Sequence, residues 1–461
     1  YLVNQPPSLG KRSGSVPKYL NRESLKYTDR LYWNNGENKY EDVTHEAGLI
    51  NMAYGLSATV GDYNRDGWPD LYVSNDFDRP DYLYINQADG TFKNRINQGV
   101  KHISNFSMGS DAGDYNNDGL LDIMVVDMVA EDHKSIKTNM GGMSVESFWE
   151  IVNNGWHYQY MFNTLQRNNG NGTFSELAHI AGVSNSDWSW GPLWADLDND
   201  GWKDLVITNG ISRNQRHSDL DNLISAKLDS LESLAEQQGK QLNELIDVME
   251  FVEMAPAIKV PNHIYRNNGD LTFEKKNGPW GFEEPTFSFG SAYADLDLDG
   301  DLDLVINNIN EYAHVYENST RQKGGGHYLR LKILKEKNSP LVGAKVKLFR
   351  NGELWQFAEL GNARGYMSKS EDWLHFGTGD INTVDSVIIA WPSGSYRVIP
   401  ELATDQSIII TQTDQEQDML PASNKKPVLF TEITEQLGLR HMHKEISYND
   451  YKKEVLLPHK M

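Results

Sequence analysis

Four short acidic segments of one pattern constrain this chain more than any other feature of its sequence. Each reads D-x-D/N-x-D-G-x-x-D, and they begin at Asp62, Asp114, Asp196 and Asp295. Oxygen-bearing side chains at positions 1, 3, 5 and 9 converge on one point only if the backbone coils tightly, and the glycine at position 6 permits that turn. Position 7 then offers its backbone carbonyl. A hard cation that accepts six or more oxygens, Ca²⁺, suits such a cage better than Mg²⁺ or Zn²⁺.

The pattern predicts about four calcium sites, one in each segment. Runs of Asp, Asn and Gly also form ordinary turns, but four copies with the same flanks favour cation-binding loops. At position 7 of the last loop, the Asp301 carboxylate is expected to point away from the ion while its carbonyl binds. The predicted metal ligands are Asp62, Asn64, Asp66, Trp68 and Asp70; Asp114, Asn116, Asp118, Leu120 and Asp122; Asp196, Asp198, Asp200, Trp202 and Asp204; Asp295, Asp297, Asp299, Asp301 and Asp303.

The residues around each loop exclude an EF-hand. An EF-hand needs a bidentate Glu at position 12 and a helix on each side. Position 12 is apolar in every copy: Val73, Val125, Ile207 and Ile306. The residues that follow are typical of a strand, and short runs of small and aromatic residues precede each loop. The predicted unit is therefore strand, calcium loop, strand.

A second element alternates with these units. Apolar alternation, an Asn/Gly turn and then Thr-Phe predict a β-hairpin at residues 83–92, 165–174 and 264–273, with a related copy at 31–43. A loop-bearing hairpin followed by a plain hairpin makes four strands, which is one propeller blade. Residues 1–4 are similar to the strand that follows each loop, so we expect a loop and further blades upstream of them.

The repeats resemble a known family. The Gly/Ala-rich strand followed by D-x-D-x-D-G-x-x-D is similar to the FG-GAP/VCBS repeat of integrin-α-like β-propellers. The resemblance implies an all-β fold for residues 1–320, a calcium-binding propeller that has seven blades when complete. Tyr54-Gly55 lies two residues further from its loop than Phe289-Gly290 does, which leaves the register of the first strand open.

Residues 321–415 are expected to form a second, small β-rich domain. Strands are predicted at 328–334, 344–349, 386–390 and 407–410. Residues 342–346, 374–379 and 391–394 resemble, in order, the motifs of the ASPIC/UnbV module, which follows FG-GAP repeats in the cartilage acidic protein-like family and in bacterial surface proteins. We expect a linker at 416–428 and the start of a second propeller at 429–461.

Two insertions interrupt the repeats, at 127–160 and 210–262. The first is rich in aromatic residues. Apolar residues at a spacing of three and four predict an amphipathic helix pair in the second, broken near Gly239. Two interpretations stay open: the apolar stripe packs on the propeller, or it docks a partner.

Composition excludes several functions. The chain has 43 Lys and Arg against 65 Asp and Glu, a net charge of −22, so nucleic acid is not an expected partner. No apolar run approaches the ~20 residues of a membrane span, and there is no cysteine for a disulfide. No nucleophile elbow, zincin motif or phosphate loop occurs. His441 and His443 are either ligands of a transition metal or solvated side chains.

Propeller geometry places the predicted binding surface opposite the calcium loops. The expected contacts with other surface or outer-membrane proteins, or with glycans, are Asn75, Asp76, Phe148, Trp149, Trp156, Tyr158, Trp188 and Arg213. The predicted function is a non-enzymatic, calcium-binding module of the cell surface or extracellular space. We expect this module to be part of an outer-membrane lipoprotein or of a glycan-handling complex. The alternative is a propeller enzyme, a lyase or hydrolase, that acts on polysaccharide.

Overall fold

The structure is a computed structural model, and it describes residues 1–4, 28–37, 39–51, 53–77, 79–138, 145–214, 217, 219–335, 339–413 and 438. The expected linker at 416–428 lies outside the described residues. So do His441, His443 and, apart from residue 438, the expected second propeller at 429–461.

Sheets of one repeated topology form the first part of the chain. Each is an antiparallel meander in which a loop-bearing hairpin is followed by a plain hairpin, as predicted. The strands are β3 (Tyr54–Gly61), β4 (Asp70–Asp76), β5 (Tyr82–Asn86) and β6 (Phe92–Asn94); β8 (Ser110–Gly113), β9 (Asp122–Val125), β11 (Thr164–Asn168) and β12 (Phe174–Glu176); β13 (Ser189–Ala195), β14 (Asp204–Asn209), β16 (His263–Asn267) and β17 (Phe273–Lys275). The last sheet has three strands: β19 (Ser288–Ala294), β20 (Asp303–Asn308) and β21 (His314–Tyr316).

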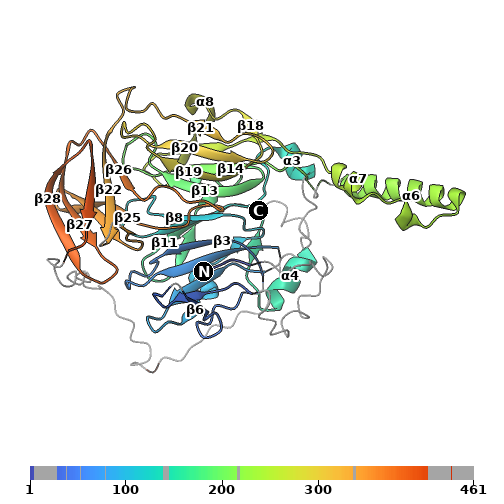
Figure 1. Cartoon of the computed structure of the whole chain (residues 1–461), viewed down its shortest axis with the longest axis horizontal. Helices are drawn as coiled ribbons and strands as arrows, with labels where there is room; N and C mark the ends of the chain where they lie inside the picture. The colour runs from blue at the N-terminus through green and yellow to red at the C-terminus, as the bar shows by residue number, and fades with distance from the viewer. Residues whose placement is uncertain are drawn as a thin grey trace.

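The first strands of the four sheets lie side by side, as the blades of a propeller do around their axis (Figure 1). Glycine permits this approach: a Cβ atom on Gly109 would lie 2.3 Å from the carbonyl oxygen of Trp190 in the next blade. In the first blade the β3–β4 pairing shifts register between Gly55 and Ser57, so Ser57 lies five residues before its loop, where the other copies have glycine. The bulge therefore explains why Tyr54-Gly55 lies two residues further from its loop than Phe289-Gly290 does.

Smaller elements complete the blades. The predicted hairpin at 31–43 is present as β1 (Tyr32–Asn34) and β2 (Tyr40–Asp42), and Leu2 bridges Arg30 just before it. Short strand pairs join β7 (Ile103–Ser104) with β10 (Gln159–Tyr160), and β15 (Val260–Pro261) with β18 (Pro285–Thr286). One-turn helices follow three outer strands: α2 (Ile96–Gly99), α5 (Ala178–Ala181) and α8 (Asn277–Trp280).

The second domain consists of two sheets packed on each other. One contains β22 (His327–Lys335), β23 (Ser339–Pro340), β26 (Leu374–Gly379) and β29 (Gln406–Thr411), and the other contains β24 (Lys345–Arg350), β25 (Glu353–Glu359), β27 (Thr383–Ala390) and β28 (Tyr396–Ala403). Leu331, Val346, Phe376 and Ile389 are buried between them. All four predicted strands are confirmed. Strands β23, β25, β26 and β28 were not predicted; polar residues hide the alternation in β25 and β28.

Most of the helical residues lie in the two insertions. Residues 127–160 include α3 (His133–Thr138) and α4 (Val145–Asn153), and residues 210–262 include α6 (Leu220–Gln238), a 3₁₀ turn η2 (Leu242–Glu244) and α7 (Val248–Glu253). Helix α6 ends at Gly239, which has a left-handed φ of 63°, so the predicted break is confirmed. No described helix is long and apolar enough to cross a membrane.

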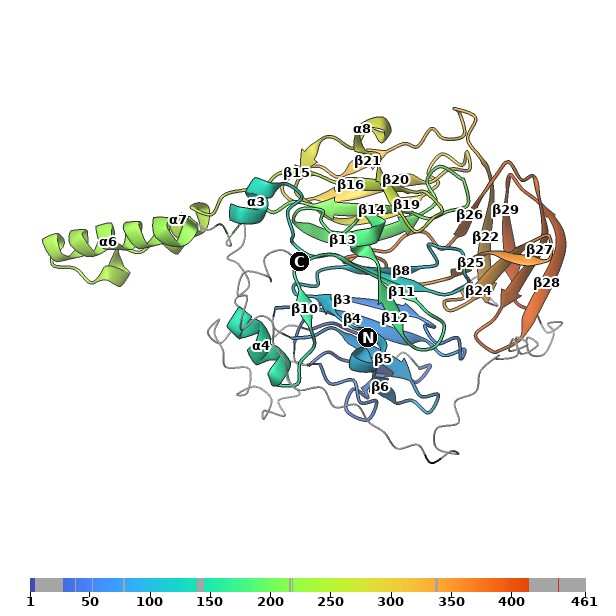
Figure 2. The ribbon, with the colours of Figure 1, turned by 180° about the vertical axis from the view of Figure 1, so that it is seen from behind.

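The helical arm (residues 219–253) extends away from the strands (Figures 1 and 2). The interpretation that its stripe packs on the propeller is therefore wrong. Within the arm, Leu231 and Ala235 of α6 are buried, and Lys227 of α6 pairs with Glu250 of α7 at 2.6 Å. Leu223, Val248 and Met249 stay exposed.

The two ends of the blades differ. The four acidic loops lie at the end that meets the second domain, which we call the loop face. The insertions lie at the opposite end, which we call the insertion face (Figure 1). This separation is the one that propeller geometry predicted.

Candidate metal centres and binding face

The four acidic loops share one backbone conformation. Position 4 is left-handed in each, with φ between 56° and 64°, and the glycine at position 6 has φ between 83° and 96°. The position-1 carboxylate accepts the backbone N–H groups of positions 5 and 6. In the first loop these bonds run from Asp66 and Gly67 to Asp62 at 3.1 and 2.9 Å. The chain therefore coils around its own carboxylates, as the spacing predicted.

The position-9 carboxylate links each loop to the plain hairpin of its blade. In the second loop, Asp122 accepts the N–H groups of Tyr115 (3.4 Å) and Asn168 (2.8 Å). The Asn168 amide in turn donates to the carbonyl of Leu121 (3.2 Å) and to that of Tyr63 (2.8 Å) in the loop of the preceding blade. Each blade is thereby joined to its neighbour.

Equivalent asparagines follow the other loops: Asn86, Asn267 and Asn318. Sequence reasoning treated these residues only as parts of turns. Their recurrence at the same place in each plain hairpin was the available signal, but their distance from the loop varies with the insertions, so spacing could not reveal the contact.

The donor groups of the loops fit a hard cation. Carboxylate oxygens of Asp196, Asp198 and Asp204, and those of Asp295, Asp297 and Asp299, lie within 4.8 Å of one another. The first two loops have Asn at position 3, which offers an amide oxygen. A donor set made only of oxygens matches Ca²⁺.

The carboxylates are also short of positive charge. The pKa of Asp70 is raised to about 7, chiefly by burial and to a lesser degree by the charges of Asp62 and Asp66, although two backbone hydrogen bonds act the other way. Burial likewise raises the pKa of Asp114 to about 6. A divalent cation would stabilise the charged forms of these groups.

Each loop meets a basic side chain. Arg330 binds Asp295 at 2.6 Å, Lys345 contacts Asp62, and both basic residues belong to the second domain. In the other two loops the basic residue comes from the propeller: Arg266 binds Asp198 at 2.5 Å, and Lys203 donates to the carbonyl of Asp114 at 3.0 Å. A bound cation and a basic side chain would therefore share the same acidic groups.

The Asp301 carboxylate does not reach solvent. It is buried, one oxygen accepts the N–H of Arg321 at 3.0 Å, and the other has no hydrogen-bond partner. Burial raises the pKa of Asp301 to about 7, with the nearby Asp299 charge acting in the same direction.

The second domain covers the loop face. Backbone N–H groups of β26 and of the residue that ends it bind the third loop: Gly377 donates to Asp196 at 3.0 Å and Gly379 donates to the carbonyl of Asn199 at 2.8 Å. His375 lies 2.7 Å from the Asn199 side-chain oxygen. The sequence predicts the order of the two domains along the chain but not the contact between them.

A loop of the second domain, residues 361–370, reaches the inner strands of the propeller. Arg364 forms a bidentate ion pair with the buried Asp111 of β8, at 2.6 and 2.8 Å. It also donates to the carbonyl of Trp194 (2.9 Å) and to the hydroxyl of Tyr293 (3.0 Å). The neighbouring Gly365 carbonyl accepts the Ser57 hydroxyl at 3.1 Å. One short segment thus contacts all four inner strands.

The predicted contact residues divide into two groups. Asn75 is buried and bonded to Asn51, Pro80 and Asp81, and Trp188 is buried in the core, against the expectation of an exposed ring. These two residues support the fold. The others lie at least partly open on the insertion face: Asp76, Phe148, Trp149, Trp156, Tyr158 and Arg213.

The exposed group centres on an aromatic cluster. Phe148 lies 5.3 Å from Trp149, 6.2 Å from Tyr158 and 5.4 Å from Tyr160, measured between ring centroids. Helix α4 and the segment 156–160 are therefore held together by rings.

Comparisons with known families agree with this architecture. The model of the FG-GAP-like repeat matches residues 22–73, 62–125 and 151–207, and the model named ASPIC and UnbV matches residues 334–417. The chain carries FG-GAP-like repeats and an ASPIC/UnbV domain. The sheets are accordingly blades of a β-propeller, and the structure adds a further repeat at 288–316 beyond the matched segments.

Curated relatives are distant. Cartilage acidic protein 1 of Homo sapiens is 23% identical over 397 residues, which cover 80% of this chain and 55% of the relative. Cartilage acidic protein 1 of Mus musculus is 23% identical over 394 residues, 84% of this chain and 49% of the relative. The chain spans about half the length of the curated relatives it matches.

Proposed function

We propose that this chain is a non-enzymatic, calcium-binding module of the cell surface or extracellular space that binds a partner through its insertion face. One observation carries the proposal: the second domain covers the face with the acidic loops, while the insertions stand on the opposite face. The acidic loops would stabilise the propeller, and the insertion face would be free to bind a partner. The FG-GAP-like repeats and the cartilage acidic protein relatives support such a role.

The calcium sites in this proposal are structural. Bound Ca²⁺ would be held at ~2.3–2.6 Å by the oxygens of each loop. The side chains at positions 1, 3, 5 and 9 and the carbonyl at position 7 would hold it, in about four sites. A rigid frame then positions the long insertions before a partner arrives, which lowers the entropic cost of binding.

The proposed partner is a glycan or a protein of the outer membrane or cell surface, and anchoring there belongs to the proposal. Exposed aromatic rings such as Tyr158 and the partly open Trp156 are suited to stack on sugar rings, and Arg79 lies over Trp156 at 4.5 Å. The alternative, a polysaccharide lyase or hydrolase, rests on the acidic clusters, which calcium binding explains without catalysis.

The two functions are separated by incubating the protein with a panel of polysaccharides in excess calcium. The proposal expects retention of a polymer without new reducing ends or unsaturated products. Trp156→Ala should weaken retention, while Trp33→Ala, which changes an exposed ring on the β1–β2 hairpin, should not. Product formation that survives purification would replace the binding module with the enzyme.

A further inference from the structure

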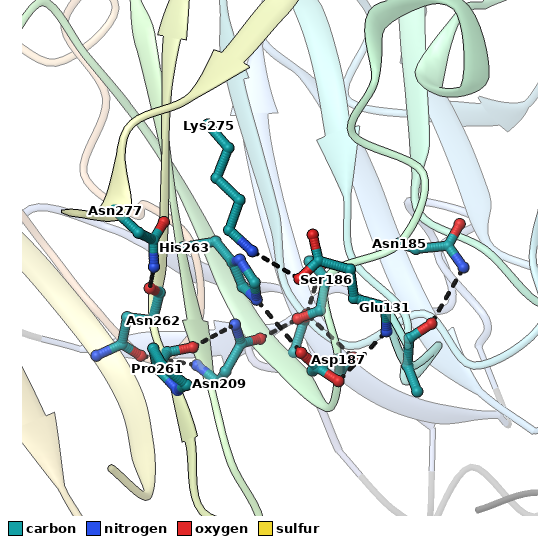
Figure 3. Close-up of polar contacts among 12 residues, drawn as sticks. Glu131, Asn185, Ser186, Asp187, Asn209, Pro261, Asn262, His263, Lys275 and Asn277 are labelled. Carbon is teal, nitrogen blue, oxygen red and sulfur yellow. Dashed lines mark hydrogen bonds and ion pairs between the residues drawn. The ribbon is translucent and has the colours of Figure 1, made fainter. Parts of the chain in front are cut away.

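Three residues on the insertion face form a cluster of different chemistry from the acidic loops. Glu131 follows β9, Asp187 precedes β13, and His263 opens β16. One donor atom from each lies within 4.8 Å of the others. They come from the second and third blades and share no residue with the four loops (Figure 3).

His263 lacks the hydrogen bonds that a buried imidazole requires. The residue is only 2% exposed, and neither ring nitrogen has a hydrogen-bond partner. Buried polar side chains are almost always bonded, so an orphaned imidazole calls for a cause. Its Nε2 atom faces Asp187 at ion-pair distance (Figure 3) but forms no hydrogen bond, and a metal ion between the two groups would bind that nitrogen.

The separation of the two groups fits shared coordination. Nε2 of His263 lies 3.4 Å from Oδ2 of Asp187, in a geometry that makes no hydrogen bond. Two ligands of a tetrahedral ion at about 2.1 Å lie roughly 3.4 Å apart. The contact therefore has the length of one edge of a zinc tetrahedron.

The carboxylates are held from both sides. The N–H of Glu131 donates to Oδ1 of Asp187 at 3.3 Å, which leaves Oδ2 facing the imidazole. Lys275 binds Oε2 of Glu131 at 2.6 Å. Glu131 is exposed, so the cluster opens to solvent on that side and has a path of entry for an ion.

We propose that Glu131, Asp187 and His263 bind a borderline divalent cation, of which Zn²⁺ is the type. One imidazole nitrogen with two carboxylates suits such an ion, whereas Ca²⁺ prefers oxygen alone. The fourth position is open to water or to an oxygen atom of a bound molecule. The site lies on the proposed binding face, but it stands on its own residues and not on the calcium loops.

The test is an equilibrium titration of the full chain with Zn²⁺ in excess Ca²⁺, which keeps the acidic loops from competing. His441→Gln and His443→Gln are introduced first, so that these two histidines, which lie outside the described residues, do not compete for zinc. We expect one zinc ion per chain. His263→Gln and Asp187→Asn should each weaken binding by roughly tenfold or more, because even the loss of a residue that only hydrogen-bonds to a metal ligand lowers metal affinity by about tenfold or more.

Two further variants make the result decisive. Lys275→Met should tighten zinc binding, because it frees Oε2 of Glu131, and it leaves every ligand in place. His314→Gln, on the half-buried histidine of β21, is the matched control and should change nothing. Co²⁺ as a probe should give a visible absorption spectrum that His263→Gln abolishes.

Zinc binding that survives His263→Gln, or a folded chain that takes up no zinc, would overturn the proposal. The same holds for Lys275→Met without effect on affinity. In that case His263 and Asp187 form an ion pair within the fold. None of these outcomes depends on whether the insertion face binds a glycan or a protein.

Discussion

At the scale of single residues, asparagine and aspartate side chains connect the blades. The position-9 carboxylate bonds its own loop to the plain hairpin of the same blade. The asparagine that it binds in that hairpin then donates to a carbonyl in the loop of the preceding blade. Asn168 illustrates this: its amide satisfies two carbonyls, those of Tyr63 and Leu121, and its own oxygen accepts the N–H of Gly170 at 2.9 Å. The two bonds to the carbonyls are buried, so water does not replace them when the asparagine is lost.

Asn168→Ala should therefore lower the free energy of unfolding by about 2–4 kcal/mol, because it leaves buried carbonyls unpaired at about 1–3 kcal/mol each. Denaturant unfolding in excess calcium measures the loss. Asn169→Ala is the matched control: that side chain donates to the Thr173 hydroxyl and accepts the Ser175 hydroxyl, both at 3.1 Å and both exposed to solvent, so its removal should cost less than about 0.5 kcal/mol. Equal effects of the two variants would contradict the blade-linking role.

A buried carboxyl outside the loops gives a pH prediction. Asp81 accepts the hydroxyls of Tyr72 (2.6 Å) and Ser107 (2.8 Å) and the N–H of Asn75 (2.8 Å), yet burial raises the pKa of Asp81 to about 7. The folded chain thus binds a proton that the unfolded chain releases above pH 3.8. Stability from this group is full at low pH and is lost as pH rises toward 7.

Asp81→Asn, which cannot titrate, should remove this loss. The stability of the variant relative to the wild type should rise between pH 4 and pH 7, by up to about 4 kcal/mol. Chemical unfolding in excess calcium at several pH values measures the difference, so that changes in the loops cancel. A difference that stays constant with pH would show that Asp81 is charged in the folded chain.

At the scale of elements, local patterns predicted hairpins and loops well. Alternation, turn residues and the glycine at position 6 act within about ten residues, so they can be recognised without the rest of the chain. The helical arm shows the limit. Spacing predicted its helices and the break at Gly239, but the apolar stripe does not pack on the propeller: within the arm Leu231 is buried, whereas Leu223 and Met249 are exposed. The spacing of apolar residues predicts an amphipathic helix, but it does not predict against which surface the apolar side of that helix packs.

The arm should be removable. At its base Ile211 and Ile258 exchange backbone hydrogen bonds of 2.9 and 2.8 Å, and the N–H of Asn214 donates to the carbonyl of Pro256 at 2.7 Å. Replacing residues 215–255 by a short Gly/Ser linker spares these contacts. We expect an unchanged calcium-dependent melting curve together with loss of partner binding. Unfolding of the variant would make the arm part of the core, and full binding would move the contact surface elsewhere.

At the scale of the molecule, the contact between the domains was beyond sequence reasoning. Lys345 and Asp62, or Arg364 and Asp111, are far apart in sequence, and no periodicity connects them. The charge pattern offered only a general hint, since acidic loops need positive charge. The fold of each domain could be predicted, while the covering of the loop face and the insertion of residues 361–370 could not.

We expect removal of the proposed calcium ions to affect both domains, because residues of the second domain contact the acidic loops. An ion that binds only the folded chain stabilises it by about 2.7 kcal/mol per site when its free concentration is 100 times the Kd. A chelator should therefore lower the melting temperature, and chelator already saturated with calcium should not. Asp118→Ala, which removes the proposed position-5 ligand of the second loop, should reduce the shift. An unchanged melting curve in excess chelator would count against calcium in the loops.

The pairing of Arg364 with Asp111 should decide whether the domains unfold together. The Asp111 side chain has no solvent exposure, so Arg364→Met leaves a buried charge without its partner, a loss of about 3–5 kcal/mol. We expect calorimetry to resolve two transitions where the wild type shows one. Arg350→Met, which removes an exposed guanidinium 5.5 Å from the Trp355 ring, should cost less than about 1 kcal/mol.

Replacing both Arg364 and Asp111 by Met should restore much of the stability, because a buried ion pair and well-packed apolar groups often stabilise a fold equally. If the double variant is as unstable as Arg364→Met alone, the arginine supports the interface by its contacts with Trp194 and Tyr293 and not by its charge.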